Sequence, residues 1–214
     1  AGAEINSVAV HNGIVAVAIQ APVKTDNGRM ALYKASDLTL LGSVVVGALP
    51  DMVTFTPDGR TVLVANEGEP SDDYQIDPEG SVSVIDVSDP TKPVARTADF
   101  TAFNGQEAAL RAKGVRIFGP GANAAKDFEP EYIAVSADGT TAWVSLQENN
   151  ALAKIDIATA KVTDVIALGY KDHGVAGNEL DVSDTDLKAD IKTWPGLRGL
   201  YLPDSITSYT VGGK

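Results

Sequence analysis

The sequence has no cysteine and only two histidines, His11 and His173. The lack of cysteine excludes a disulfide framework, thiolate metal sites and cysteine nucleophiles. Two isolated histidines do not supply a multi-histidine zinc site, and a lone histidine is usually structural. The sequence also lacks a serine nucleophile elbow, a Ser-His-Asp grouping and a His-Glu-x-x-His helix. It therefore gives no support to hydrolysis by an activated side chain.

Basic residues and long apolar runs are scarce as well. Lys and Arg number 17 against 29 Asp and Glu, which gives a formal net charge of −12 and a pI near 4.5. Such a charge repels phosphate backbones and anionic lipid, so nucleic-acid binding is not expected, whereas cation binding and simple solubility both fit. No run approaches the roughly 18 apolar residues of a membrane helix. No signal peptide opens the chain, so we expect either that a leader was removed or that more protein precedes Ala1.

What the sequence does contain is an internal repeat. The segment 50–55 matches 130–135, an offset of 131 − 51 = 80, and the same offset carries Asp58-Gly59 onto Asp138-Gly139. The segment 80–86 matches 150–156 at an offset of 70, so the earlier copy has 80 − 70 = 10 extra residues inside it. A third copy precedes these two and a fourth begins near Pro203. Self-similarity at this spacing is the mark of a repeat architecture.

Each copy contains four short β-rich runs, and Asn-Gly or Asp-Gly joins the first two. These dipeptides favour a tight hairpin because they tolerate positive φ. The sequence therefore predicts an all-β fold, a β-propeller of four-stranded antiparallel blades with short helical insertions. A β-sandwich would not explain the constant order of turns. The expected organisation is one propeller domain over 1–214, with blades at 5–47, 50–98 and 130–168, a further blade starting at 203–214, and insertions at 99–129 and 169–202.

About three and a fraction blades do not close a ring. An open array leaves an apolar blade face and strand edges exposed. We therefore expect the ring to be completed by sequence beyond Lys214 or by another chain, and this remainder is the expected partner.

The longest loop between strands, Asn66–Gly80, is rich in acid. Its carboxylates are Glu67, Glu69, Asp72, Asp73, Asp77 and Glu79. Calcium takes six to eight oxygen ligands from a loop that can fold around it, so the loop is a candidate calcium site. It lacks the ligand spacing of an EF-hand. A solvated acidic loop remains the alternative.

The two insertions carry further signals. In the first, Asn104 is expected to be the N-cap of a short helix that ends before Gly114. In the second, Asp181, Asp184 and Asp186 have a spacing suited to a calcium loop. Alternatively, Ser183 and Asp184 cap a helix that runs to Lys188.

An acid also recurs at one place in successive blades. Asp51, Glu131 and Asp204 stand at the entry of the predicted innermost strand. Because that strand lines the channel of a propeller, these side chains are expected to ring one channel mouth and to attract a cation or a cationic ligand. Alternatively, each caps a turn beside its own blade, since a proline precedes each acid.

Several segments resemble the choice-of-anchor I family of bacterial surface propellers, whose members are labelled alkaline-phosphatase-like, phytase-like or surface proteins. The resemblance covers essentially the whole chain and rests on 46–52, 56–59, 65–70, 77–83, 100–107, 118–121 and 168–173. It implies an exported, many-bladed propeller, often anchored at the cell surface, of which this chain is an N-terminal portion. Family members usually continue past the position of Lys214 with another acidic loop.

Two functions follow as hypotheses. The first is an extracellular, periplasmic or cell-surface propeller that binds a ligand or serves as a scaffold, with calcium stabilising its acidic loops. The second is a calcium-dependent phosphomonoesterase acting at the channel mouth. Phosphate transfer also needs basic groups aimed at the anion. Among the basic residues of the insertions, Arg116, Lys126 and Lys171 are the plausible candidates. The sequence does not identify the ligand.

Overall fold

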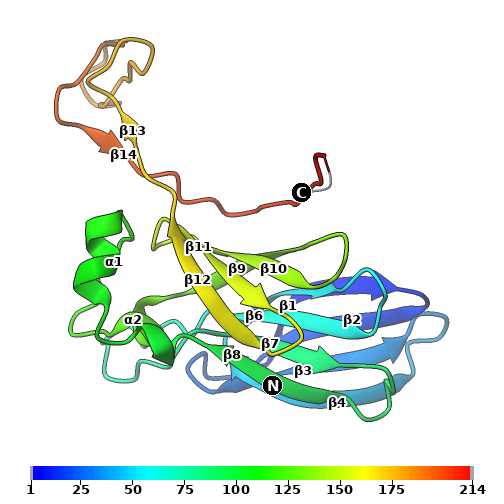
Figure 1. Ribbon diagram of the computed structural model, residues 1–214. Helices are drawn as coiled ribbons and strands as arrows, with labels where there is room; N and C mark the ends of the chain where they lie inside the picture. The colour runs from blue at the N-terminus through cyan, green and yellow to red at the C-terminus, as the bar shows by residue number, and fades with distance from the viewer. Residues whose placement is uncertain (1, 213–214) are drawn as a thin grey trace.

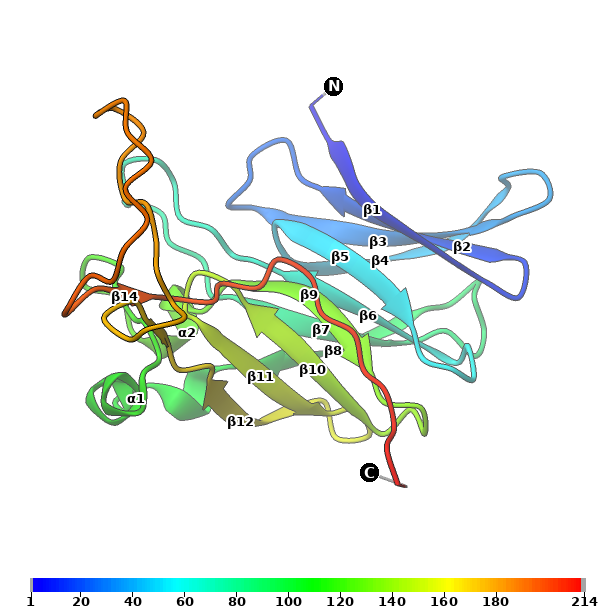
Figure 2. The same cartoon turned by 90° about the horizontal axis from the view of Figure 1, so that it is seen from above.

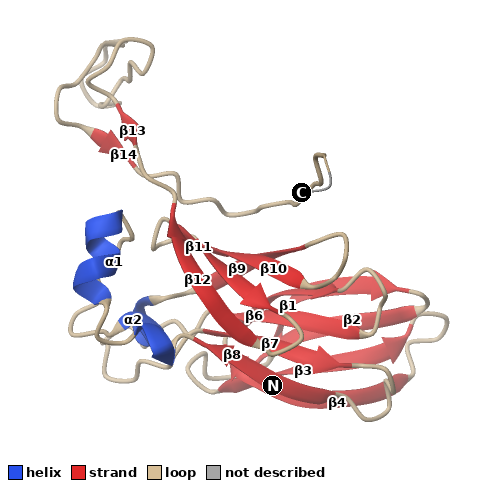
Figure 3. Cartoon of the chain, in the orientation of Figure 1, coloured by secondary structure: helices blue, strands red, loops and turns tan. Residues whose placement is uncertain are grey.

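A computed structural model describes residues 2–212 and shows three four-stranded antiparallel sheets (Figures 1 and 3). Within each sheet the strands are neighbours in chain order. The first sheet holds β1 Glu4–His11, β2 Ile14–Gln20, β3 Asn27–Lys34 and β4 Leu40–Ala48. The second holds β5 Pro50–Phe55, β6 Thr61–Asn66, β7 Ser81–Asp86 and β8 Val94–Asp99. The third holds β9 Pro130–Val135, β10 Thr141–Leu146, β11 Ala151–Asp156 and β12 Lys161–Ala167. We call these sheets blades 1, 2 and 3.

The hairpin between the first two strands is built in the same way in blades 2 and 3. Asp58 Oδ1 accepts hydrogen bonds from Thr56 Oγ1 at 2.7 Å and from the Arg60 amide at 3.0 Å. Asp138 Oδ1 accepts the equivalent bonds from Ser136 Oγ and from the Thr140 amide. Gly59 and Gly139 each have φ of +70°, which costs glycine little. The repeated Asp-Gly signal is therefore a repeated turn.

The core lies between adjacent blades. In β6, Val62, Leu63, Val64 and Ala65 are all fully buried, because blade 1 covers one face of the strand and blade 3 covers the other. A run buried on both faces explains why β6 is continuously apolar rather than alternating. Each large side chain buried in this way stabilises the fold by about 1.5–3 kcal/mol.

Blade 1 presents an apolar face away from blade 2. Val8 pairs with Val17, and Val10 pairs with Val15, so these four side chains share one face. Val8 and Val10 are 55% and 64% exposed. An apolar outer face of this kind is what one blade of a ring presents to the next.

The insertion between blades 2 and 3 holds η1 Thr101–Phe103, α1 Glu107–Lys113 and α2 Ala124–Asp127. Gly114 ends α1 in the left-handed conformation, as expected. The predicted N-cap is wrong, because α1 begins after Gln106 and has no side-chain cap. The turn of η1 instead leaves Asn104 free to accept a hydrogen bond from the Ala125 amide at 2.9 Å, so Asn104 fixes α2.

The second insertion is an arm that projects away from the sheets (Figure 1). It is closed by β13 Lys171–Asp172 and β14 Arg198–Gly199. The predicted helix from Ser183 to Lys188 is wrong, since this segment contains only bends. Asp181 and Asp186 accept hydrogen bonds from amides two residues ahead, and such local bonds compete with helix formation.

The segment 203–212 follows the arm and contains no strand in the described structure. It crosses blade 3 in an extended course beside β9 (Figure 2), where Ser208 Oγ donates to the Val135 carbonyl at 2.6 Å. The last part of the expected fourth blade, residues 213–214, lies outside the described residues.

Candidate functional site

The long connections all lie at one end of the blades. The loop after β6, the helical insertion and the arm are at that end, whereas the tight hairpins lie at the other (Figure 2). Antiparallel strands reverse direction at each turn, so connections after second and fourth strands necessarily share an end. We call it the loop end. Loops held by a rigid scaffold are where binding residues usually lie, so the search for a site starts there.

The structure places Asp51, Glu131 and Asp204 in one electrostatic group at the loop end. Burial raises the pKa of Asp51, and the nearby Asp204 raises it further. The pKa of Glu131 rises to about 7 through burial, then through the charges of Glu148, Asp204 and Asp51. Carboxyl groups that each raise the pKa of their neighbours lie close together.

Three further glutamates, Glu67, Glu129 and Glu148, enlarge this group. The pKa of Glu67 rises to about 8, first through burial and then through Asp51, Glu69, Glu131 and Glu129. The pKa of Glu129 rises to about 7 through burial and then through Glu148 and Glu69. We define the mouth cluster as Asp51, Glu67, Glu129, Glu131, Glu148 and Asp204.

Glu129 and Glu148 were missed by the sequence analysis. The pairing of β9 with β10 indicates where these two residues lie, because Pro130 at the start of β9 pairs with Leu146 of β10. Residues flanking that pair must therefore lie at the channel entrance. Gln147 stands where blade 2 has Glu67, at the offset of 80. With the nitrogen of its side-chain amide facing Glu131, Gln147 donates a hydrogen bond to Glu131 Oε1 at 3.0 Å.

A hollow of about 380 Å³ is bounded by the innermost strands β5 and β9 and by the extended segment. Its wall includes Met52, Thr54, Tyr132, Ala134, Ile206 and Ser208. No member of the mouth cluster lines this hollow, whose wall is mainly apolar and includes His11 and Pro57 at the end of the tight hairpins.

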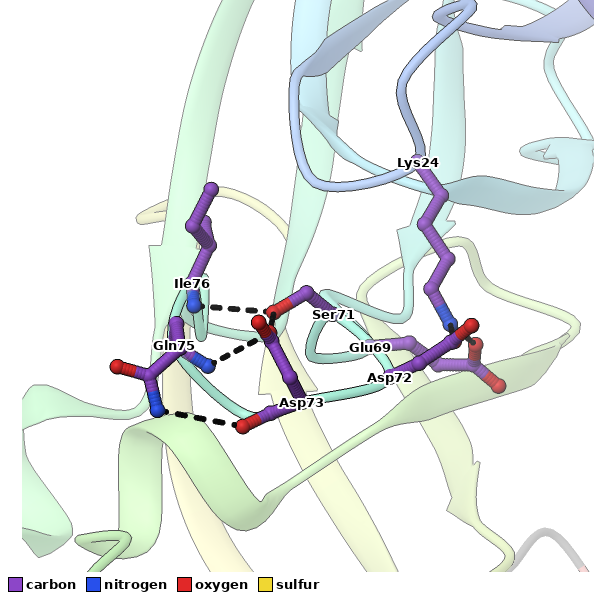
Figure 4. Close-up of polar contacts among 7 residues, drawn as sticks. All are labelled: Lys24, Glu69, Ser71, Asp72, Asp73, Gln75 and Ile76. Carbon is purple, nitrogen blue, oxygen red and sulfur yellow. Dashed lines mark hydrogen bonds and ion pairs between the residues drawn. The ribbon is translucent and has the colours of Figure 1, made fainter.

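The other carboxylates of the acidic loop have local partners (Figure 4). Lys24, from the β2–β3 loop, places Nζ 2.9 Å from Glu69 and 3.7 Å from Asp72, and the hydrogen bond to Glu69 raises the pKa of Lys24. Asp73 Oδ1 accepts from Ser71 Oγ at 2.7 Å and from the Gln75 amide, and these bonds lower the pKa of Asp73. The carboxylates of the loop that was predicted to be one calcium site therefore contact separate partners.

Asp77 lies apart from those pairs, on the side of the loop that faces the helical insertion. Burial raises its pKa, the nearby Lys126 opposes this rise and Asp127 adds to it. Asp127 itself is buried and accepts hydrogen bonds from the Phe118 and Gly119 amides and from Asn149 Nδ2. These bonds tie the insertion to blade 3.

The carboxylates predicted in the arm lie in one irregular loop. Asp181 accepts hydrogen bonds from the Ser183 and Asp190 amides, and Asp186 accepts one from the Lys188 amide. Asp184 lies exposed between them. His173 is buried and its Nδ1 lies 2.8 Å from the Asn178 carbonyl, so it packs the base of the arm. Over residues 2–212, no three His, Asp or Glu side chains are close enough to hold a metal ion directly.

Comparisons with known proteins assign the chain to a family. The family model described as the choice-of-anchor I domain matches residues 1–214. The chain belongs to this family. No curated protein matches its sequence. None of the helices in the described part of this choice-of-anchor I domain has the length and apolar character to span a membrane.

Solved structures confirm the fold of this choice-of-anchor I domain. It resembles the β-propeller domain of Myceliophteria thermophila Cps50 (Swd1), with a TM-score of 0.51 and 11% identity over 78% of this chain and 44% of that one. It also resembles the Pseudomonas aeruginosa periplasmic gluconolactonase PpgL, with a TM-score of 0.50 and 15% identity over 71% of this chain and 39% of that one. The chain therefore spans less than half the length of these propellers, and the prediction of an all-β propeller is confirmed.

Proposed function

We propose that this domain is a ligand-binding module of a secreted or cell-surface propeller and that its mouth cluster binds calcium. The observation that carries the proposal is the convergence of carboxylates from blades 2 and 3 and from the extended segment. Among residues 2–212, no Lys or Arg forms an ion pair with any member of the cluster. Gathering like charges without a counter-ion is unfavourable, and a bound cation offsets that cost.

The donor set of the cluster suits calcium. Calcium accepts six to eight oxygens at 2.3–2.6 Å and combines carboxylates with backbone carbonyls and water. A pair of carboxylates such as Asp51 and Glu131 is therefore enough when water and backbone oxygens complete the shell. Bound calcium would also give the mouth a positive centre that can attract an anionic or carbonyl-bearing ligand.

Thermal unfolding of the full chain tests the proposal. Calcium at about 100 times its Kd stabilises a one-site protein by about 2.7 kcal/mol, which raises Tm by roughly 5–10 °C at this size. We expect the double variant Asp51→Asn, Glu131→Gln to lose most of this rise. The matched control is Asp164→Asn, an exposed carboxylate on β12 that should respond as the wild type does. Equal calcium responses in the wild type and the double variant would refute the proposed site.

A calcium-dependent phosphomonoesterase is the second candidate, favoured by one contact. Arg116 Nη1 donates to the Glu148 carbonyl at 3.0 Å, so a guanidinium lies beside the mouth cluster where it can meet a phosphate. Hydrolysis of a generic phosphate monoester by the full chain, with and without chelator, tests this activity. No hydrolysis at any calcium concentration would remove the candidate and leave the binding role unaffected.

A further inference from the structure

A second recess lies at the loop end, between the acidic loop and the helical insertion. It holds about 240 Å³ and is lined by Lys24, Glu69, Pro70, Ser71, Asp72, Tyr74, Phe118 and Glu129. We call it the loop pocket. Its walls come from the β2–β3 loop, the acidic loop and the insertion, rather than from the outer faces of blades 1 and 3, where further blades of a ring pack. The lining of the pocket therefore includes no residue from those outer faces.

Two aromatic rings form part of the wall. Tyr74 is 46% exposed and Phe118 is 43% exposed, although both are large side chains that usually gain from burial. The guanidinium carbon of Arg116 lies 3.7 Å from the centroid of the Phe118 ring. Arg116 therefore covers one face of this ring, and the exposed remainder of the ring is what a ligand can contact.

The pocket also holds an ammonium group of the protein itself. Lys24 reaches across from blade 1 and places Nζ against Glu69 and Asp72 (Figure 4). Lys24 therefore already pairs with Glu69 and Asp72, and the remaining carboxylate of the lining is Glu129. Glu129 lines the same recess, and no Lys or Arg of the described residues forms an ion pair with it.

From these observations we propose that the loop pocket binds a primary alkylammonium group against Glu129 and the rings of Tyr74 and Phe118. Carboxylates alone attract any cation, whereas aromatic rings beside them favour a weakly hydrated organic cation. The volume is below the roughly 300–1,000 Å³ of sites for drug-sized ligands. The pocket therefore suits one ammonium and its alkyl chain, whether from a small amine or from a lysine side chain.

Calorimetric titration of the full chain with 1,5-diaminopentane tests this inference. Chelator is present throughout, so that calcium binding at the mouth cluster does not contribute and either proposal can fail alone. We expect saturable binding that Tyr74→Ala and Phe118→Ala each weaken by roughly fivefold or more, as loss of a cation–π contact requires. Tyr74→Phe keeps the ring and should bind as the wild type does. Tyr209→Ala, which removes an 83% exposed ring elsewhere, is the matched control.

The source of the ammonium is distinguished by a second titrant, Nα-acetyl-lysine amide. Binding of the diamine alone would support a free amine as ligand, and binding of both would support a lysine side chain. Absence of binding by both compounds would overturn the inference. So would equal binding by the wild type and both alanine variants, because the net negative charge alone would then account for the attraction. Circular dichroism of each variant checks that it folds.

Discussion

At the residue scale, two sets of carboxylates in this domain have pKa values shifted in opposite directions. Asp58, Asp73 and Asp138 accept hydrogen bonds from a hydroxyl and an amide in their own turns, and these bonds lower their pKa values. Glu67 and Glu131 are partly buried beside other acids, and their pKa values rise to about 8 and about 7. The first group stabilises turns in its charged form. The second group favours the folded state when its carboxyl groups are protonated or when they bind a cation.

The raised pKa of Glu67 predicts a pH-dependent effect of Glu67→Gln. Its folded-state pKa of about 8 exceeds the ordinary value of 4.5, so the folded state binds more protons between these limits. The favourable contribution of protonated Glu67 to the free energy of unfolding is therefore present at low pH and is lost as pH rises through about 8. In chelator, we expect Glu67→Gln to raise Tm at pH 9 by roughly 2–4 °C and to change it little at pH 5.

Asp73→Asn is the control of opposite sign. The pKa of Asp73 is lowered in the folded state, so its contribution is present above the unfolded pKa and is lost as pH falls through the lower folded pKa. The substitution should therefore lower Tm at neutral pH. The same Tm change for Glu67→Gln at pH 5 and pH 9 would contradict the account of Glu67.

At the element scale, β6 is the strand on which blade packing depends most directly. It is the second strand of blade 2 and is buried on both faces, whereas the outer strand β8 exposes four of its six residues. The apolar run and the adjacent Asp-Gly turn made β6 predictable from sequence. The start of α1 was not predictable, because η1 takes the preceding residues into another turn and gives Asn104 a distant partner.

Leu63→Ala is expected to destabilise the domain by about 2–5 kcal/mol, because it leaves a cavity where two blades meet. Val94→Ala on β8 is the matched control, since Val94 is 61% exposed and should change stability by less than about 0.5 kcal/mol. Urea unfolding of the wild type and both variants measures the difference. A loss below about 1 kcal/mol for Leu63→Ala would contradict the packing described for β6.

At the scale of the whole molecule, the offset between repeats was enough to predict the blades and to align Asp51 with Glu131. The partners of the carboxylates in the acidic loop were not predictable, because one of them is Lys24, which lies 45 residues before Glu69 in the sequence. The positions of Glu129 and Glu148 likewise depend on how β9 and β10 pair at the channel entrance. Local sequence thus determined turns and strands, whereas contacts between blades determined which carboxylates share a site.

We propose that acids from successive blades form one cation-binding mouth. A crystal structure of the full chain grown with calcium tests it most directly. We predict a calcium ion within about 2.3–2.6 Å of carboxylate oxygens of Asp51 or Glu131, with other members of the mouth cluster around it. Calcium bound instead among Asp181, Asp184 and Asp186, or a mouth whose carboxylates lie apart with no ion between them, would contradict the claim.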